Sequence, residues 1–394
     1  MRSGTFTQGF IGLGQRPVFT LYHHNEFTVY PVKPLEKIKA AIRRKGADAL
    51  LVTQPENRRY LSDYTATDLS IAESSGVLLV PGKGTPLLLT DSRYHLQAEK
   101  EATDFEVVLV RSTLLGAVQK MLSQLGIRRL LFESHYLLHA TAVKLMDLGQ
   151  KQNIQIIPAS GMVEKLRLVK SPEEIDNIRR AVELNELVFQ EIYQSLISGQ
   201  TEREIALAIE SAMMLKGAEA PAFPTIVAAG PNAAAPHAVP TDRAIKEGET
   251  VIIDMGLKLN GYCSDMTRTV VLGKPDKRTK KAIRLVRKAQ RAAIKIIRAG
   301  ILAREADGAA RKIITDAGFG KYFGHGLGHG VGLAVHEPPS LNRMRRNKLQ
   351  AGMVVTVEPG IYLPGWGGVR LENMVVVEEG GCTILNQDTT FLDL

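Results

Sequence analysis

Cysteine is scarce in this sequence. Only Cys263 and Cys382 occur among the 394 residues, and two thiols cannot form the disulfide framework of a small secreted domain. Long apolar runs are missing as well, because no segment approaches the roughly 20 residues of a membrane-spanning helix. An early apolar stretch, FIGLG, is too short and too rich in glycine for a signal-peptide core. We therefore expect a cytoplasmic protein with no membrane partner.

Aromatic residues make up only 6% of the chain, and none lies within its most basic segment, residues 276–300. Proteins that bind single-stranded nucleic acids stack the bases on aromatic side chains. In this segment apolar residues recur at helical spacing, while Lys and Arg occupy the other face. The segment therefore predicts a solvated amphipathic helix. Despite a formal net charge of +9, we expect no nucleic-acid partner.

The length of 394 residues exceeds what one compact core usually supports, so we expect two domains. Residues 1–32 have no clear periodicity and predict an N-terminal extension. Residues 33–168 alternate helical stretches with short apolar strands, which predicts an α/β domain. Residues 169–394 form the second expected domain. Its first helix is signalled by Ser171 and Glu174, a Ser-x-x-Glu capping box.

Two β-branched runs in residues 251–270 are joined at Asn260-Gly261, which is a strong hairpin signal. With a two-residue turn there, Asp254 lies opposite Thr267. Asp254 and Asp265 are then diagonal neighbours on one face, roughly 7–8 Å apart at Cα. Two carboxylates at this distance repel each other unless protons or cations lie between them. They are well placed to hold two metal ions about 3.5–4 Å apart.

Glycine occupies every even position from Gly324 to Gly332 in the segment GHGLGHGVGLAVHEPP. A period of two suggests a strand with one bare face, against which other backbone packs closely. His325 and His329 then share the opposite face. A His-x-x-x-His pair usually indicates zinc on a helix, but this density of glycine disfavours a helix.

A third segment, residues 354–380, reads as strand, Pro/Gly-rich loop and strand. Glu358 ends the first strand, and Arg370 and Glu372 share a face of the second. An arginine there would orient a ligand carboxylate. Each segment alone has a simpler explanation, such as a solvated hairpin, a structural histidine or an exposed acid. Together they predict a metal site, since buried carboxylates without partners are costly. The five expected ligands are Asp254, Asp265, His329, Glu358 and Glu372.

The order Asp–Asp–His–Glu–Glu lies in the contexts IIDMG, CSDMTRT, HGLGHGVGL, TVEPGIY and GVRLEN. In this respect the chain resembles the metallopeptidase family of aminopeptidase P, prolidase and methionine aminopeptidase. The resemblance implies an α+β pita-bread catalytic domain over residues 169–394. Residues 33–168 resemble, more weakly, the N-terminal domain of creatinase and prolidase. Creatinase lacks the metal ligands, whereas all five are present here.

The resemblance also implies a role for each site residue. Asp265 and Glu372 would bridge two divalent ions, Asp254 would hold one of them, and His329 with Glu358 the other. The oxygen-rich ligand set favours Mn²⁺, with Co²⁺ or Zn²⁺ as alternatives. A hydroxide activated by the two ions would attack the scissile carbonyl. The catalytic residues implied are His237, His336, Glu358, His325 and Arg370, and the substrate-binding residues are Phe223, His237, His325, Val335 and His336.

These inferences predict an aminopeptidase that hydrolyses the Xaa-Pro bond at the N-terminus of peptides, and we expect a homodimer. The first alternative is an Xaa-Pro dipeptidase, or prolidase. Many short prolidase-like relatives carry an arginine shortly after the His-Glu-x-Pro element, where it meets the carboxylate of a dipeptide. Ser340 occupies that position here, which weakens the dipeptidase alternative. A different class of alternative is a non-catalytic binding protein with the same fold, but retention of all five ligands argues against it.

Overall fold

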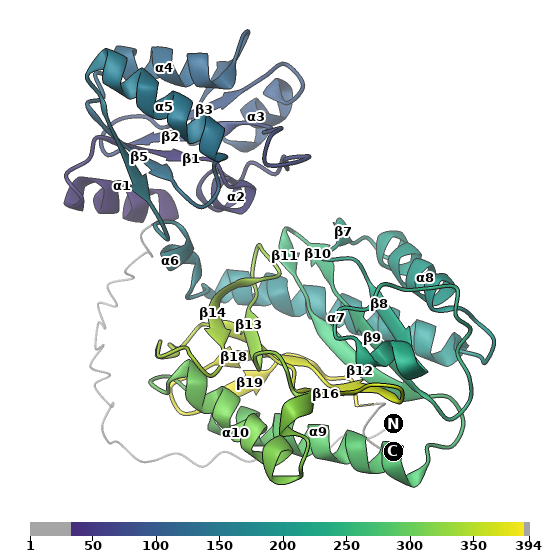
Figure 1. Ribbon diagram of the computed structural model, residues 1–394. Helices are drawn as coiled ribbons and strands as arrows, with labels where there is room; N and C mark the ends of the chain where they lie inside the picture. Colours follow the sequence, from purple (N-terminus) through teal and green to yellow (C-terminus); the bar gives the residue numbers. More distant parts are fainter. Residues whose placement is uncertain (1–32, 390–394) are drawn as a thin grey trace, which may run out of the picture. The chain divides into compact units, whose positions relative to one another are not determined.

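The computed structural model describes residues 33–389, so the expected extension over residues 1–32 lies outside the described part (Figure 1). Within residues 33–389, no helix is both long enough and apolar enough to span a membrane.

A mixed six-stranded sheet with the order β4-β3-β2-β1-β5-β6 forms the centre of the N-terminal domain. β1 pairs antiparallel with β2 and parallel with β5. The strands are β1 (Ala49–Val52), β2 (Val77–Pro81), β3 (Leu87–Thr90), β4 (Glu106–Leu109), β5 (Arg129–Glu133) and β6 (Gln155–Ala159). The helices are α1 (Pro34–Arg44), α2 (Pro55–Ser62), α3 (His95–Glu101), α4 (Leu114–Gln124), α5 (His139–Gln152) and α6 (Glu164–Arg167).

Helices cover both faces of this sheet (Figure 1). Side chains of α1, including Ile38 and Ile42, pack with Leu50 and Val52 of β1 on one face. Side chains of α4 and α5 pack on the other face with the alternate residues of β1, including Leu51. Both faces are apolar because successive side chains of a strand point to opposite sides. The predicted α/β domain is therefore present.

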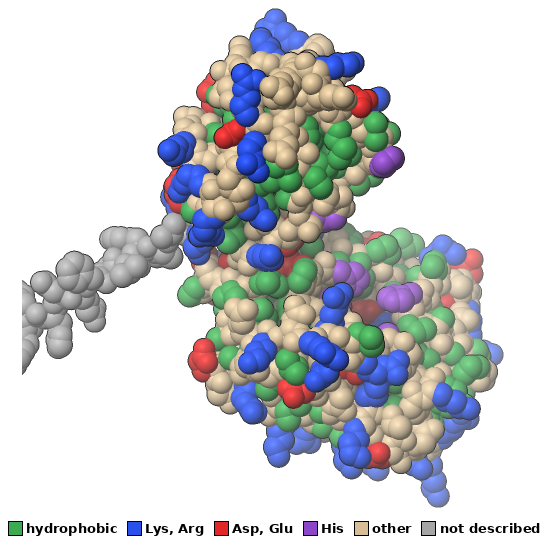
Figure 2. Space-filling model, turned by 60° about the vertical axis from the view of Figure 1, so that its left-hand side comes forward, with side chains coloured by type: hydrophobic (Ala, Val, Ile, Leu, Met, Phe, Trp, Pro, Cys, Tyr) green, Lys and Arg blue, Asp and Glu red, His purple; other side chains and the backbone are tan. Residues whose placement is uncertain are grey.

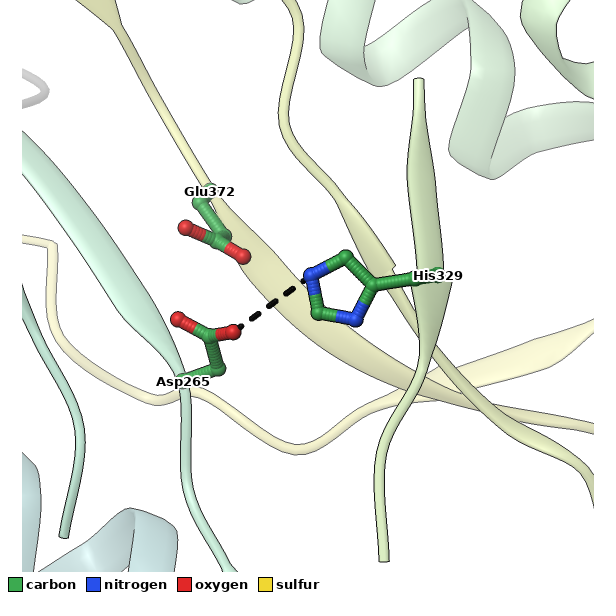
Figure 3. Close-up of side chains that lie close together, drawn as sticks. All are labelled: Asp265, His329 and Glu372. Carbon is green, nitrogen blue, oxygen red and sulfur yellow. Dashed lines mark ion pairs between the residues drawn. The ribbon is translucent and has the colours of Figure 1, made fainter. Parts of the chain in front are cut away.

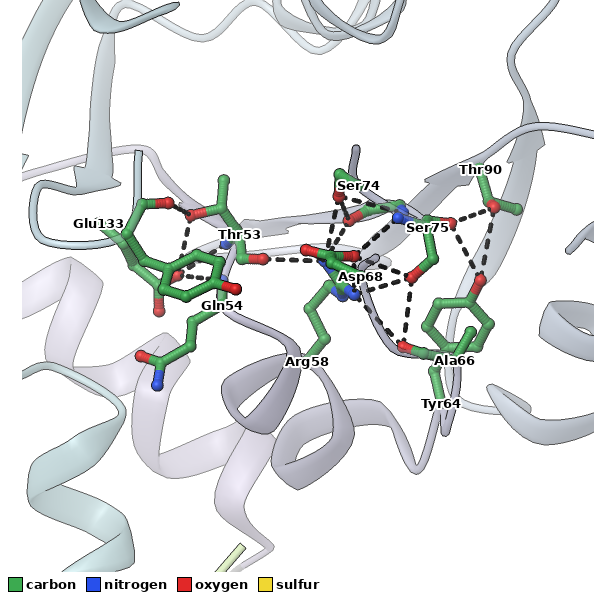
Figure 4. A network of polar contacts seen from close by, with 12 residues as sticks. Thr53, Gln54, Arg58, Tyr64, Ala66, Asp68, Ser74, Ser75, Thr90 and Glu133 are labelled. Carbon is green, nitrogen blue, oxygen red and sulfur yellow. Dashed lines mark hydrogen bonds and ion pairs between the residues drawn. The ribbon is translucent and has the colours of Figure 1, made fainter. Parts of the chain in front are cut away.

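A buried arginine holds the loop after α2 in place. The guanidinium of Arg58 donates to the carbonyl oxygens of Thr53 and Gly76 at 2.8 and 2.7 Å, and it pairs with Asp68 at 2.7 Å (Figure 4). A fully buried cation requires such compensation, because its desolvation is costly. Glu133 lies nearby in the same network and accepts hydrogen bonds from the Thr53 and Gln54 amides.

Up to residue 389, where the described part ends, the C-terminal domain combines small antiparallel sheets with four long helices. The sheets have the orders β11-β10-β7, β12-β9-β8, β14-β13-β15-β18-β19 and β16-β17. Their strands are β7 (Ala220–Pro221), β8 (Ile226–Ala229), β9 (Thr250–Met255), β10 (Leu257–Leu259), β11 (Tyr262–Cys263), β12 (Met266–Val271), β13 (Gly328–Gly330), β14 (Glu337–Leu341), β15 (Val354–Val357), β16 (Gly360–Leu363), β17 (Gly367–Arg370), β18 (Asn373–Val377) and β19 (Cys382–Ile384).

The four long helices are α7 (Pro172–Ser195), α8 (Glu202–Leu215), α9 (Lys277–Ile296) and α10 (Ala303–Asp316), and there are two short 3₁₀ turns, η1 (Gly230–Ala234) and η2 (Gly320–Tyr322). The predicted capping box of Ser171 and Glu174 begins α7. The basic segment forms α9, which buries its apolar stripe as predicted. α7 and α8 pack on β8, β9 and β12, whereas α9 and α10 pack on the sheet that contains β15 and β18. Two helix-covered halves thus place their strands towards each other (Figure 1).

Candidate metal centre

The predicted hairpin is present, with the predicted register. Leu259 pairs with Tyr262 across the turn, and Asp254 of β9 pairs with Thr267 of β12. Asn260 and Gly261 have φ values of 50° and 81°, the left-handed backbone that a tight hairpin turn of this kind requires. As a result, the carboxylates of Asp254 and Asp265 reach the same cavity.

The glycine-rich segment is only partly a strand. β13 covers Gly328–Gly330, and the pairing with β14 shifts register between His329 and Gly330. The prediction of a strand from Gly324 to Gly332 was therefore wrong in its extent. The expected close packing is present, because a side chain at Gly328 would collide with the carbonyl oxygen of Thr356. His325 and His329 both line the cavity, as the shared face predicted.

Three of the five expected ligands form a tight cluster. Ligand atoms of Asp265, His329 and Glu372 all lie within 4.8 Å of one another (Figure 3). The Nε2 atom of His329 lies 3.6 Å from the nearer oxygen of Asp265 and 3.4 Å from that of Glu358. The clustered residues come from the link between β11 and β12, from β13 and from the link between β17 and β18, so segments far apart in sequence converge here.

The protonation state of His329 fits a metal ligand. Burial lowers the pKa of His329 to about 4, so the ring is neutral at pH 7. Its Nδ1 atom lies 3.1 Å from the carbonyl oxygen of Gly330 and must carry the proton to donate this hydrogen bond. Nε2 then presents a lone pair to the oxygens of Asp265 and Glu358. Lone pairs facing one another are unfavourable unless a carboxyl proton or a metal cation lies between them.

Buried oxygens without hydrogen-bond partners point to the same conclusion. Among the described residues, Asp254 Oδ1 and Glu372 Oε1 are buried and have no partner. Burial, and then the neighbouring carboxylates, raise the pKa of Asp265 and Glu358 well above the usual range. For Glu372 burial, and then Asp254, raise the pKa to about 8. This donor set fits divalent cations, whose charge replaces the protons that the carboxyl groups would otherwise retain.

Arg370 holds one side of the carboxylate cluster. Its Nη2 atom donates to Asp254 Oδ2 at 2.6 Å, and its Nε atom donates to the hydroxyl of Thr267 at 3.1 Å. That hydroxyl donates in turn to Glu372 Oε2 at 2.6 Å. Arg370 thus contacts an expected ligand carboxylate, and its role in orienting that ligand stays a prediction. The position of Thr267 opposite Asp254 was predicted, but its hydrogen bonds to Arg370 and Glu372 were not.

A second polar chain runs from Arg370 to His325 through Tyr362. The Nη1 atom of Arg370 donates to the Tyr362 hydroxyl at 2.9 Å, and this hydroxyl lies 2.9 Å from Nε2 of His325. His325 Nδ1 lies 2.7 Å from the carbonyl oxygen of Gly326, to which it donates. Burial lowers the pKa of His325 to about 4, so its Nε2 accepts the proton of the Tyr362 hydroxyl. Tyr362 was not predicted as a site residue, because a tyrosine in an apolar strand is common and nothing in the sequence distinguishes this one.

The ligand cluster opens into a cavity of about 500 Å³. Phe223, His237 and His336, which were expected to bind substrate, are among its lining residues, and the ring centroid of His336 lies 4.3 Å from that of His329. Figure 2 shows histidine side chains gathered around a hollow in this surface, with acidic side chains between them. The cavity is also lined by residues that were not predicted as site residues: Pro224, Thr225, Ile226, Pro236, Ala238, Val239, Pro240, Gly326, Gly328 and Asn342.

Val335 does not line this cavity. It packs instead against the cluster of Ile178, Val182 and Cys263, so the structure does not support its predicted contact with substrate. The residue lies just before β14, where the chain turns its apolar side chain towards α7 and the polar ring of His336 towards the cavity.

Comparisons with known proteins agree with these observations. Residues 176–379 match the model of metallopeptidase family M24, and residues 34–169 match that of the creatinase/prolidase N-terminal domain. An Xaa-Pro dipeptidase of Pyrococcus horikoshii is 35% identical over 88% of this chain and 95% of its own.

Two solved structures are similar over almost their whole length. The Xaa-Pro dipeptidase from Bacillus anthracis is 36% identical with a TM-score of 0.84, over 90% of this chain and 97% of its own. The X-Pro aminopeptidase from Thermotoga maritima is 36% identical with a TM-score of 0.80, over 89% and 98%. The predicted creatinase-type N-terminal domain and pita-bread catalytic domain are thus confirmed, and the chain belongs to metallopeptidase family M24.

Proposed function

We propose that this protein hydrolyses the bond between an N-terminal residue and a following proline, with two divalent ions in the cluster described above. One observation carries the proposal: the unprotonated Nε2 of His329 faces carboxylate oxygens at 3.4 and 3.6 Å. This arrangement is stable when a cation lies between the groups. The ions would be held by Asp254, Asp265, His329, Glu358 and Glu372, with Mn²⁺ favoured by the oxygen-rich ligand set.

The side chains around the cluster have separate tasks in this proposal. Bound divalent ions supply hydroxide near neutral pH by lowering the pKa of a water molecule. Glu358 receives a proton, which its position beside His329 in the cavity lining supports. His237 and His336 line the cavity outside the ligand set, where they donate to the oxygen that becomes negative and to the leaving nitrogen. Arg370 keeps Asp254 in position.

The apolar wall of the cavity suits a proline ring. Phe223, Ile226 and Val239 are among its lining residues. An Xaa-Pro bond is a tertiary amide without an N–H group, so an enzyme cannot recognise it by hydrogen bonding to that nitrogen. Apolar contacts around the pyrrolidine ring replace that hydrogen bond as the basis of selection.

Two candidate activities, an Xaa-Pro dipeptidase and an Xaa-Pro aminopeptidase, differ in the length of the peptide that they cleave. The names of the relatives favour the dipeptidase, which was the alternative in the sequence analysis, over the aminopeptidase that was predicted first. We therefore propose Xaa-Pro dipeptides as the first substrate class. Ser340 favours the aminopeptidase as the second candidate. Among residues 33–389, the cavity lining contains no lysine or arginine besides Arg370, which already pairs with Asp254.

A direct comparison of substrates tests both candidates. After chelation and addition of Mn²⁺, kcat/KM is measured on an Xaa-Pro dipeptide and on the matching Xaa-Pro-Yaa tripeptide. Preference for the dipeptide supports the first candidate, and preference for the tripeptide supports the second. No cleavage of either substrate would contradict the proposed activity.

We also propose a boundary between the two domains at residues 168–169. The homodimer and the cytoplasmic location stay predictions.

A further inference from the structure

Glu337 directly follows His336 and carries a buried carboxylate that no step of the proposed reaction uses. Its side chain is only 6% exposed. It accepts a hydrogen bond from Lys170 Nζ at 2.6 Å, and its other oxygen pairs with the guanidinium of Arg167. The side chains of both cations are almost fully buried as well, at 1% and 4% exposure. A buried carboxylate paired with two buried cations fixes the geometry of the backbone that carries it, because breaking these pairs is costly.

The absence of a side chain at Gly332 leaves room for the carboxylate of Glu337. A side chain at Gly332 would collide with the carboxylate of Glu337, so the glycine allows the acid to lie against the backbone of the loop before β14. The Gly332 carbonyl also accepts the amide of Cys263, which fixes the loop against the hairpin. Glu337 is therefore anchored on the side away from the cavity, whereas His336 lines the cavity.

Arg167, one of the two cations that hold Glu337, takes part in a polar network of the N-terminal domain. Arg167, at the end of α6, donates to Asn57 Oδ1 at 2.7 Å. The amide of Asn57 donates to Glu133 at 2.6 Å and to Glu164 at 2.7 Å. Glu133 belongs to the network drawn in Figure 4. A continuous series of buried polar contacts thus leads from β5 to the residue beside His336.

We propose that Glu337, held by Arg167 and Lys170, is a positioning residue that sets the orientation of His336 in the cavity. The N-terminal domain then contributes to turnover through this ion-paired anchor, without contacting the substrate. The inference rests on the proposed role of His336. A displacement of about 1 Å in a catalytic group costs up to about 10²-fold in rate, so loss of the anchor should lower kcat about 10- to 100-fold.

A double-mutant cycle distinguishes positioning from a purely structural role. Glu337→Gln in the full-length, metal-loaded enzyme should lower kcat and leave KM and metal content nearly unchanged. In the His336→Ala background the same substitution should have almost no further effect on kcat. The matched control is Asp176→Asn, an acid-to-amide change in an exposed ion pair of α7 with Arg180, which should leave kcat unchanged.

Glu337→Gln leaves two buried cations without a counter-ion, and the variant could unfold. Lys170→Met is the second variant, because it keeps the pair between Arg167 and Glu337; it should lower kcat less, again only when His336 is present. An equal loss of kcat with and without His336 would overturn the inference, as would an unchanged kcat in both variants. Wild-type activity of His336→Ala itself would instead contradict the proposed function.

Discussion

Removal of the metal ions should make the stability of the catalytic domain fall as the pH rises from about 7 to about 8.5. In the metal-free protein, burial and neighbouring carboxylates raise the pKa of Glu372 to about 8 and those of Asp265 and Glu358 well above the usual range. The unfolded chain has carboxyl groups with pKa values of about 4. The folded state therefore binds more protons in this range, and its stability decreases as the pH rises.

The magnitude follows from the pKa of Glu372. Between about pH 7 and about pH 8.5, a folded group with a pKa of about 8 and an unfolded pKa near 4 loses about 1 kcal/mol of stability. Asp265 and Glu358 add to this loss as far as they titrate in the same range. The lowered pKa values of His325 and His329, about 4, act in the opposite sense. The stability that these two histidines contribute to the folded state is lost as the pH falls from about 6.5 to about 4. This range lies mostly below the pH range of the experiment.

Urea unfolding in the presence of a chelator measures the effect. The single tryptophan, Trp366, packs against the core of the catalytic domain, so its fluorescence reports that domain. A loss of about 1 kcal/mol should shift the urea midpoint downward by about 0.3–1 M. Metal-loaded protein should show a flatter pH profile, because the bound ions keep the carboxylates ionised, and Glu372→Gln should reduce the slope. A midpoint of the metal-free protein that rises or stays constant with pH would refute the reasoning.

Three further predictions follow from the site. Arg370→Gln removes the donor to Asp254 and should weaken metal affinity about 10- to 100-fold, measured by calorimetric titration of the metal-free protein; unchanged affinity would contradict the orienting role. Ser340→Arg should raise kcat/KM on an Xaa-Pro dipeptide relative to the tripeptide, because arginine can bind a carboxylate with two hydrogen bonds; an unchanged ratio would remove Ser340 as a determinant of length. His237→Ala and His336→Ala should each lower kcat about 10²–10³-fold with metal content intact, and loss of metal would identify the residue as a ligand.

Local patterns predicted the parts of the site that depend on neighbouring residues. Asn260-Gly261 fixed the hairpin register, and this register placed Asp254 opposite Thr267. Ser171 and Glu174 correctly marked the start of α7. Such predictions succeed because turn geometry and capping are determined within a few residues.

Contacts between distant segments were not predictable in the same way. Tyr362 bridges Arg370 and His325 only because β16 pairs with β17 beside the glycine-rich segment. The register shift after His329 shortened the expected strand, and no local signal indicates it. Val335 was expected in the cavity, but the orientation of one side chain before β14 depends on packing against α7.

Metal content measured together with activity tests the central claim most directly. Wild-type protein reconstituted with Mn²⁺ should contain about two ions per chain and cleave an Xaa-Pro substrate, and the chelated protein should be inactive. Asp265→Ala removes a member of the cluster formed with His329 and Glu372, so it should lose at least one ion together with the activity. Full activity of Asp265→Ala or of the chelated protein would contradict the account of the site as a two-metal peptidase centre.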